Sequence, residues 1–440
     1  MTPTFGTDGV RGAAFSELTV DYVQRLGRVA VEVLALTDVV VGRDTRESGP
    51  AFAEAIAAGA VSAGARVIDI GVAPTPAIAF VAQHLGCAGV SITASHNPHQ
   101  DNGVKIFSVG GTKLLDVEQE RIEQALHHQG EGSGTGVVDV SRRAELLGVY
   151  AAHVRTAVGE RTLQGMTIVV DCANGAMSEA APEVIAALGA TVIVINDEPN
   201  GRNINEGCGA THPEVVGEAV RLHGAQLGLA FDGDGDRVIA VDHQGEVVDG
   251  DHLIALAALD ARERGQLDGG VVVTVMTNAG FHRAMREAGI EVVTTAVGDR
   301  NVLAAMEERR FVLGGEQSGH IIHARHATTG DGLLAGAILA AMVQRKNRTL
   351  RELARAAMTS LPQALVNVRI AQRVQDPMSV MQDEVRDAER RLGTSGRVLL
   401  RASGTEPMVR VMVEAETQSL ADQTAKSLAD VVAERFGVVR

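Results

Sequence analysis

Runs of β-branched and other apolar residues alternate with Ala-rich segments over most of the chain. In three places an apolar run is followed by an Ala-rich segment that a glycine ends, and then by a second apolar run. The terminating glycines are Gly64, Gly189 and Gly289. This order predicts a strand–helix–strand unit, because glycine readily adopts the left-handed conformation found just after many helices. The chain therefore repeats one α/β plan at domain-sized intervals.

The apolar runs have the length and composition of strands that are buried on both faces. They lie at residues 39–44 and 65–70, at 167–171 and 191–194, and at 271–275 and 291–293. Continuous apolar strands are typical of parallel or mixed sheets that helices cover on both sides. Residues 333–343 are also apolar, but a span across a bilayer needs about 18 or more such residues. This stretch therefore predicts a buried helix.

The final part of the chain follows a different plan. Two extended runs, at residues 397–401 and 409–414, flank a polar loop, and an amphipathic helix is expected at 420–436. We therefore expect an α/β fold with four domains around a central cleft: three related α/β domains with mixed sheets and a C-terminal α+β domain. The expected domains comprise residues 1–150, 151–250, 251–365 and 366–440, with a Gly/Ser-rich linker at 130–136 and the last junction within 363–384.

Composition and charge narrow the classes of partner. With 40 basic and 55 acidic residues, the formal net charge of −15 argues against nucleic acid or an anionic membrane as the main partner. The cysteines, Cys87, Cys172 and Cys208, show no metal or redox spacing, and their odd number fits a reducing cytosol. The sequence shows no leader-like opening, so we expect a cytoplasmic protein. An anionic substrate would then need a local basic site.

A serine in the stretch TASHNP, residues 93–98, is the first candidate for chemistry. Ser95 directly precedes His96, but neighbouring side chains point to opposite faces of a strand and do not meet on a helix, so His96 is a poor candidate for its base. The stretch also lacks the G-x-S-x-G pattern of a nucleophile elbow. A polar loop that caps a helix is the alternative. Lys105, in DNGVK, could bridge a phosphate or act as a base if desolvated.

Three aspartates alternate with glycines in DGDGDR, residues 232–237. The carboxylates of Asp232, Asp234 and Asp236 can surround one hard cation, since glycine lets the backbone fold their oxygens inward. An EF-hand calcium loop is excluded, because it requires Gly and Glu where this chain has Arg237 and His243. Three protein ligands leave room for a phosphate oxygen, which suits Mg²⁺. An acidic hairpin turn is the alternative.

The loop GGEQSGH, residues 314–320, joins two short apolar runs. Its polar side chains Glu316, Gln317 and Ser318 suit the hydroxyl groups of a sugar. His320 at its end is a candidate for the site, with an ordinary surface histidine as the alternative.

The loop RASGTEP, residues 401–407, lies between the two extended runs of the last domain. Hydroxyls and backbone N–H groups of Ser403, Gly404 and Thr405, with the guanidinium groups of Arg401 and Arg410, can hold a phosphate dianion. A plain β-turn is the alternative.

Together these motifs resemble those of the α-D-phosphohexomutase superfamily over essentially the whole chain, most closely those of its phosphoglucosamine mutase branch. The motifs are FGTDGVRG (5–12), TASHNPHQDNGVK (93–105), DGDGDR (232–237), VGDR (297–300), GGEQSGH (314–320) and RASGTEP (401–407). Gln317 and the FGTDGVRG opening point to this branch. Asn301 departs from it, because the branch often has an aromatic residue there.

The resemblance implies an intramolecular phosphotransferase that interconverts glucosamine-6-phosphate and glucosamine-1-phosphate. A phosphoserine at Ser95 would exchange its phosphoryl group with the sugar through a sugar 1,6-bisphosphate, which also primes the enzyme. The resemblance further implies a homodimer and a role in supplying UDP-N-acetylglucosamine and cell-wall precursors.

The resemblance also implies a role for each candidate residue. One Mg²⁺ per active site would bind to Ser95, Asp232, Asp234 and Asp236. Arg11 and Arg237 would neutralise the reacting phosphate, and Lys105 or His320 would remove the proton of the sugar hydroxyl. The remaining substrate contacts would come from Arg300, Glu316, Gln317, Ser318, Arg401, Ser403, Gly404, Thr405 and Arg410.

Other functions stay open from the sequence. A phosphomannomutase/phosphoglucomutase would use the same chemistry on a 2-hydroxy sugar and differ in a few loop residues, so a substrate panel separates it. A sugar-phosphate sensor without catalysis could lose Ser95, which is present here together with the three aspartates. A metal-dependent phosphatase would show net phosphate release.

Overall fold

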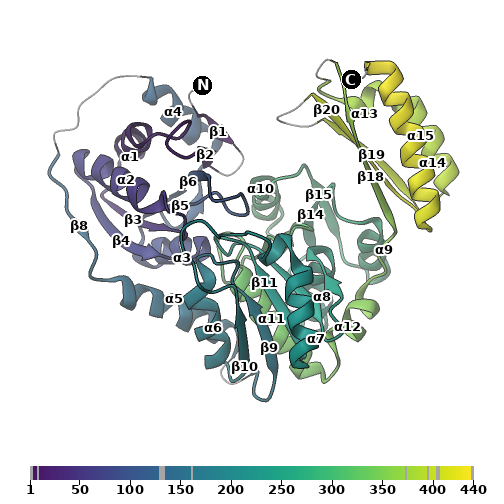
Figure 1. Cartoon of the computed structure of the whole chain (residues 1–440), viewed down its shortest axis with the longest axis horizontal. Helices are drawn as coiled ribbons and strands as arrows, with labels where there is room; N and C mark the ends of the chain where they lie inside the picture. The colour runs from purple at the N-terminus through teal and green to yellow at the C-terminus, as the bar shows by residue number, and fades with distance from the viewer. Residues whose placement is uncertain are drawn as a thin grey trace. The chain divides into compact units, whose positions relative to one another are not determined.

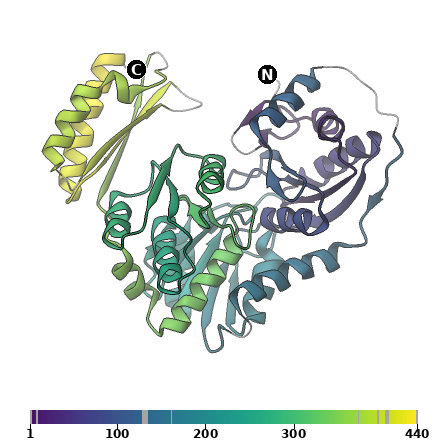
Figure 2. The ribbon, with the colours of Figure 1, turned by 180° about the vertical axis from the view of Figure 1, so that it is seen from behind.

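The computed structural model describes residues 3–6, 9–127, 134–159, 162–371, 374–393, 396–402 and 407–437. The chain divides into two compact units, which are described here one at a time (Figures 1 and 2). The first unit comprises residues 1–276 and 290–357, and the second comprises residues 277–289 and 358–440.

A mixed sheet forms the N-terminal part of the first unit. Its strands are β1 (Phe5–Gly6), β2 (Gly9–Ala13), β3 (Asp38–Arg43), β4 (Arg66–Val72), β5 (Ala88–Ile92), β6 (Asp101–Ser108), β7 (Thr112–Lys113) and β8 (Val138–Asp139). Their order is β1-β2-β6-β5-β3-β4-β8, with β7 beside β6. Strands β3, β4, β5 and β8 are parallel, and β6 runs antiparallel to β5. The first predicted strand–helix–strand unit is thus β3, a helix and β4.

Helices cover both faces of this sheet, as the continuous apolar strands predict. They are α1 (Val20–Leu34), α2 (Gly49–Ser62), α3 (Thr75–Leu85), α4 (Asp116–Leu126) and α5 (Arg143–Val158). One buried cluster joins α1, α2 and α4 to side chains such as Val39 and Val90, and another joins α3 and α5 to Val40 and Ile68. The alternation of Val39 and Val40 between the two clusters follows from the two-residue period of a strand.

A second mixed sheet follows along the chain. It consists of β9 (Thr167–Asp171), β10 (Thr191–Ile195), β11 (Leu227–Phe231), β12 (Val238–Asp242) and β13 (Val247–Val248), in the order β10-β9-β11-β12-β13. Its helical segments are α6 (Met177–Ala187), the 3₁₀ turn η1 (Gly209–Thr211) and α7 (Pro213–His223). Strands β11 and β12 form an antiparallel hairpin, and residues 232–237 form its turn. The aspartate motif therefore lies where two interior strands of this sheet end and begin.

A third sheet repeats the plan with shorter strands. They are β14 (Val271–Thr274), β15 (Val292–Thr295), β16 (Leu313–Gly315) and β17 (Ile321–His323), in the order β15-β14-β16-β17. The associated helices are α8 (Gly250–Glu263), α10 (Asp299–Arg309), α11 (Gly332–Lys346) and α12 (Leu350–Ala357). Residues 333–343 lie within α11 and are almost all buried, as predicted. Within the described part of the chain, no helix combines the length and apolar character that a membrane span requires.

The second unit contains an antiparallel sheet with helices. Its strands are β18 (Gln363–Arg369), β19 (Arg397–Ala402) and β20 (Met408–Glu414), in the order β18-β20-β19. Its helices are α9 (Ala279–Glu287), α13 (Pro377–Val380), α14 (Gln382–Leu392) and α15 (Gln418–Phe436). The backbone N–H of Ala279 donates to Glu414 at 2.8 Å, and Arg397 donates to the Thr277 carbonyl at 2.6 Å. These bonds hold residues 277–289 against the sheet.

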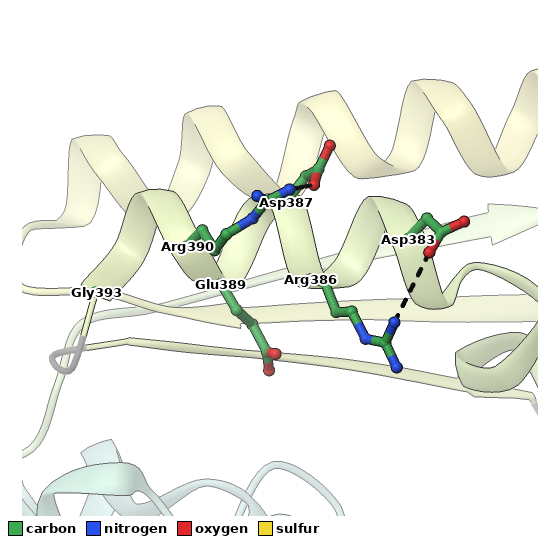
Figure 3. A pocket seen from close by; sticks show the side chains of 6 residues that line it. All are labelled: Asp383, Arg386, Asp387, Glu389, Arg390 and Gly393. Carbon is green, nitrogen blue, oxygen red and sulfur yellow. Dashed lines mark hydrogen bonds and ion pairs between the residues drawn. The ribbon is translucent and has the colours of Figure 1, made fainter.

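A charged surface hollow lies beside α14 in the second unit (Figure 3). Arg386 pairs with Asp383, and Arg390 pairs with Asp387, along the exposed face of the helix. Exposed pairs of this kind contribute little to stability. None of the residues predicted for the site lines this hollow.

Two predicted domain boundaries fall inside continuous elements. The boundary after residue 150 lies in α5, which buries Leu146, Tyr150 and Val154 one turn apart, so its apolar face continues through that point. The boundary after residue 365 lies in β18, which pairs with β20 along its whole length. Of the predicted linker, residues 130–133 lie outside the described residues, while Gly134 and Gly136 donate backbone hydrogen bonds to carbonyls at the end of α2.

Close packing of α1 on α2 generates a stability prediction. A Cβ at Gly59 would lie 1.9 Å from the backbone oxygen of Gln24 and 2.8 Å from the backbone nitrogen of Arg28, and neither atom can move independently. We expect Gly59→Ala to lower the free energy of unfolding by about 1–3 kcal/mol. The matched control is Gly148→Ala in α5, where a Cβ meets no atom within 4 Å.

Thermal unfolding of both variants measures this difference. Gly148→Ala should stabilise the protein by about 0.5–1 kcal/mol, because alanine is the better helix former. A Gly59→Ala protein that unfolds at or above the wild-type temperature would contradict the α1–α2 packing described here.

Candidate active site

Ser95 occupies a strained turn just after β5. Its φ of +54° is uncommon for a residue other than glycine, and strain of this kind persists only where the surroundings hold it. The Ser95 N–H donates to Thr93 Oγ1 at 2.9 Å, and its carbonyl accepts from Asn205 at 2.9 Å. The side chain is buried, and its Oγ donates to Asp232 Oδ2 at 2.5 Å. The turn thus directs the hydroxyl at the aspartate motif.

Arg46 holds this turn, and the sequence analysis missed it. Its buried guanidinium pairs with Asp44 at 2.9 Å and donates to the carbonyls of Ser95 at 3.0 Å and Asn97 at 2.8 Å. It also donates to Pro98 and, at 3.0 Å, to Asp101. The available signal was the presence of Asp44 and Arg46 just after the buried strand β3. Because β3 and β5 are parallel neighbours, residues that follow β3 lie close to those that follow β5.

The three aspartates of the β11–β12 turn converge as predicted. Asp232, Asp234 and Asp236 are all buried, and one carboxylate oxygen from each lies within 4.8 Å of the others. Among the described residues, no group forms a hydrogen bond with the Oδ1 atoms of Asp234 and Asp236, although both atoms are buried. Buried carboxylate oxygens without a partner are costly, and a divalent cation such as Mg²⁺ would satisfy them. The donor set therefore fits this ion.

Lys105 is one of the cations that the chain itself places against these carboxylates. It lies on β6, and its Nζ donates to Asp234 Oδ2 at 2.8 Å and Asp236 Oδ2 at 2.9 Å. Thr75, which the sequence analysis did not identify, also donates to Asp234 Oδ2, at 2.7 Å. A single Lys105 Nζ therefore joins two of the three carboxylates.

The aspartates differ in electrostatic environment. Burial, and then the charges of Asp234 and Asp236, raise the pKa of Asp232 well above its ordinary value. Burial also acts to raise the pKa of Asp236, but the ammonium of Lys105 and the neighbouring His320 and Arg237 outweigh it, so this pKa falls well below its ordinary value. Asp236 is therefore ionised at neutral pH.

The β16–β17 turn brings some of its predicted residues to the site and leaves others outside. Glu316 is buried and accepts the Gly298 N–H at 3.1 Å, whereas Gln317 donates to Asp249 at 3.3 Å and Ser318 is exposed. His320 is buried rather than at the surface, with Nδ1 3.7 Å from Asp236. The structure thus places Glu316 and His320 close to the aspartates.

A pocket of about 410 Å³ opens beside this cluster within the first unit. Its charged and polar lining comprises Thr4, Arg11, His96, Asp236, Arg237, Asp299, Glu316 and His320. Burial, together with the charges of Arg237 and Arg11, lowers the pKa of His96 to about 4, so this imidazole is neutral at pH 7. The pocket therefore offers two guanidinium groups to an anion beside the Ser95 turn.

Arg300, which the resemblance assigns to substrate binding, is not among the residues that line this pocket. It donates to Gln119 at 3.1 Å and pairs with Asp116, both on α4. Because α10 begins at Asp299 and successive helical side chains point in different directions, Asp299 lines the pocket and Arg300 is directed elsewhere. Asp299 itself is paired with Lys113.

The predicted phosphate loop of the second unit is described in part. Ser403, Gly404 and Thr405 lie outside the described residues. Arg401 and Arg410 stand directly opposite each other on β19 and β20. Two like charges in this position repel, and the buried Nε of Arg410 forms no hydrogen bond with any described residue. An anion between them would relieve both conditions.

Comparison with known proteins places this geometry in a family. Models of phosphoglucomutase/phosphomannomutase alpha/beta/alpha domains I, II and III match residues 2–132, 149–245 and 249–361, and the C-terminal domain model matches 365–431. The phosphoglucosamine mutase of Rhodococcus opacus is 49% identical over 445 residues, which cover 98% of this chain and 100% of that protein.

Solved structures agree at the level of the fold. The phosphoglucomutase/phosphomannomutase family protein of Burkholderia thailandensis aligns with a TM-score of 0.82 at 25% identity and covers 98% of both chains. The Aspergillus fumigatus N-acetylphosphoglucosamine mutase, solved with GlcNAc-6P and magnesium, aligns with a TM-score of 0.67 at 21% identity and covers 99% of this chain and 96% of its own. The chain therefore belongs to the phosphoglucomutase/phosphomannomutase family of enzymes, in the group of the phosphoglucosamine mutases.

Proposed function

We propose that this chain interconverts glucosamine-6-phosphate and glucosamine-1-phosphate, with Ser95 as the phosphoryl carrier. The observation that carries the proposal is the Ser95 hydroxyl, which donates to Asp232 at 2.5 Å within the buried aspartate cluster. Relatives named phosphoglucosamine mutase support the amino-sugar substrate. The pocket beside Ser95, with its guanidinium groups, supports an anionic ligand.

The reaction consists of two transfers of the same kind. The free hydroxyl of the sugar phosphate loses its proton and bonds to the phosphorus of phosphoserine, while the bond from phosphorus to Ser95 Oγ breaks. The resulting 1,6-bisphosphate reorients in the site. Ser95 Oγ then bonds to the phosphorus at the other position, while the bond from that phosphorus to the sugar oxygen breaks and this oxygen regains a proton. Phosphoryl transfer depends mainly on positioning and charge neutralisation, so Ser95 needs no triad partner.

Asp232, Asp234 and Asp236, with an oxygen on Ser95, would hold one Mg²⁺. The bound ion supplies neutralisation of the charge on the phosphoryl group and on the Ser95 oxygen. Arg11 and Arg237 would bind the non-bridging oxygens from the pocket wall. The buried Oδ1 atoms of Asp234 and Asp236, which form no hydrogen bond with any described residue, support this assignment.

Lys105 and His320 are the two proposed acceptors for the proton of the sugar hydroxyl. The ion pairs of Lys105 with Asp234 and Asp236 favour its charged form, which acts as a cation rather than a base. His320 lines the pocket, but its Nε2 accepts the N–H of Gly330 at 3.1 Å. His320 would therefore accept a proton at Nε2 only after that hydrogen bond is released.

The remaining substrate contacts are assigned by position. Glu316 would accept hydrogen bonds from sugar hydroxyls in the pocket, with Gln317 and Ser318 beside it on the same turn. Arg401 and Arg410, with the predicted contributions of Ser403, Gly404 and Thr405, would bind the phosphate that is not reacting.

We also propose, on the resemblance, that the enzyme is a cytoplasmic homodimer whose product supplies UDP-N-acetylglucosamine and cell-wall precursors. The sugar 1,6-bisphosphate would prime it by phosphorylating Ser95. A size measurement in solution tests the homodimer. Intact-mass spectrometry, which counts phosphates on the chain, tests the phosphorylation of Ser95.

Ser95→Ala tests the phosphoryl carrier. We expect it to lose nearly all conversion of glucosamine-6-phosphate and to take up no phosphate from glucosamine 1,6-bisphosphate, because the neighbouring hydroxyl, that of Thr93, is buried and donates to Asp44 Oδ2 at 2.7 Å. The readouts are mutase turnover, circular dichroism and intact mass. Ser62→Ala is the matched control, because Ser62 Oγ donates only to the Gly59 carbonyl, on α2.

Near-normal turnover of a folded Ser95→Ala protein would contradict the proposal. Glucose and mannose phosphates should be assayed in parallel on the wild type. Faster conversion of either would show that the amino-sugar assignment is wrong, while the role of Ser95 would stand.

Arg410→Ala tests the proposed binding of the phosphate that is not reacting. A charge-assisted hydrogen bond contributes about 1.5–3 kcal/mol, so kcat/KM should fall about ten- to hundredfold in both directions. Arg386→Ala removes an exposed guanidinium from α14 in the same unit and should leave the kinetics unchanged (Figure 3). Unchanged kcat/KM in both directions for Arg410→Ala would show that Arg410 does not bind this phosphate.

A further inference from the structure

A buried tyrosine and a buried aspartate, which no motif singled out, form a hydrogen-bonded pair close to the site. The Tyr150 hydroxyl on α5 donates to Asp331 Oδ1 at 2.9 Å and Oδ2 at 3.0 Å. Tyr150 is 1% exposed and Asp331 3% exposed, so water cannot replace either partner. A buried hydroxyl or carboxylate left unpaired is costly, and the pair is therefore held together.

Asp331 transmits this fixed position to the backbone around it. Its Oδ1 accepts the Leu334 N–H at 2.9 Å and so caps α11, while its own N–H donates to the Ile321 carbonyl on β17 at 3.2 Å. Burial raises the pKa of Asp331 to about 6, and hydrogen bonds from Leu334 and Tyr150 oppose that rise. At neutral pH the carboxylate is therefore largely ionised and accepts from Tyr150.

The residues on either side of Asp331 lie directly against the site. The Gly330 N–H donates to His320 Nε2 at 3.1 Å, and the Gly332 N–H donates to the Gly235 carbonyl of the aspartate motif at 3.0 Å. A Cβ at Gly330 would lie 2.5–2.6 Å from three atoms of the His320 ring. Such close contact means that a small shift of Asp331 would move the His320 ring.

The Gly330 hydrogen bond also determines where His320 carries its proton. A ring nitrogen that accepts an N–H has no proton of its own, so a neutral His320 is protonated at Nδ1. Nδ1 lies 3.7 Å from Asp236 Oδ1, a buried oxygen that forms no hydrogen bond with the described residues. The ring is thus oriented by Gly330 on one side and faces Asp236 on the other.

From these contacts we infer that Tyr150 and Asp331 are positioning residues for the reaction. They act through Gly330 and Gly332, which fix the tautomer and orientation of His320 and the backbone of the aspartate motif. The inference rests on the proposed function, because it assigns the pair to phosphoryl transfer in the pocket that His320 lines. It also gives α5, the helix that continues through the predicted boundary after residue 150, a role in the site.

Tyr150→Phe tests the inference by removing one hydroxyl and keeping the ring. We expect kcat to fall about ten- to hundredfold with KM nearly unchanged, because slight misplacement of a reacting group costs rate rather than binding. The side-chain ¹H–¹⁵N spectrum of His320, assigned with His320→Gln, should change from the Nδ1–H form of the wild type to a mixture of forms. Asp331→Asn, whose amide oxygen still accepts from Tyr150 and Leu334, should keep both properties better than Asp331→Ala.

Tyr22→Phe is the matched control, because the chain has only these two tyrosines and the Tyr22 hydroxyl donates to the Pro3 carbonyl at 3.1 Å rather than to Asp331. It should keep wild-type kcat and the His320 signal. Wild-type kcat and an unchanged His320 signal in Tyr150→Phe would overturn the inference, as would equal losses of kcat in both tyrosine variants. If the wild type itself lacks mutase turnover, the proposed function fails, and the His320 signal alone decides whether the pair positions that ring.

Discussion

Mutual repulsion of three buried carboxylates is the constraint on which the site depends. Asp232, Asp234 and Asp236 come from one short turn, and their oxygens gather within 4.8 Å in a region that water does not reach. Charges in such a place must be paired or neutralised. Lys105 neutralises part of this negative charge through ion pairs with Asp234 at 2.8 Å and Asp236 at 2.9 Å. The two oxygens that remain without a hydrogen bond leave a place for a cation.

Other loops of the first unit reach this cluster through close backbone contacts. A Cβ at Gly233 would lie 2.7 Å from the Ser95 carbonyl, and one at Gly319 would lie 2.3 Å from the Val238 carbonyl. Because only glycine fits at such separations, the Ser95 turn and the β16–β17 turn pack against the aspartate turn through main-chain atoms. This arrangement provides the fixed geometry on which phosphoryl transfer depends.

The sequence predicted the local elements well and the long-range contacts poorly. The strand before the aspartates and the buried α11 follow from apolar patterns, and the convergence of the aspartates follows from their spacing. The role of Arg46 could not be predicted from the sequence, because its partners are carbonyls near Ser95. Those carbonyls lie close to Arg46 only because β3 pairs with β5. The contacts of Arg300 with α4 could not be predicted, because a residue at the start of a helix can face either way until the neighbouring helix is known. From the sequence, Tyr150 is indistinguishable from any other core residue of its helix, because its hydroxyl bonds to Asp331, 181 residues away along the chain.

Calorimetric titration with Mg²⁺ tests directly whether the aspartate cluster binds this ion, because it does not depend on turnover. We expect one Mg²⁺ per wild-type chain and clearly weaker binding by Asp234→Asn, which loses one carboxylate from the cluster. Asp268→Asn, which alters an exposed carboxylate paired with Arg325, should bind Mg²⁺ like the wild type. A wild-type protein that binds no Mg²⁺, or an Asp234→Asn protein with unchanged affinity, would contradict the assignment of the buried aspartates as the metal site.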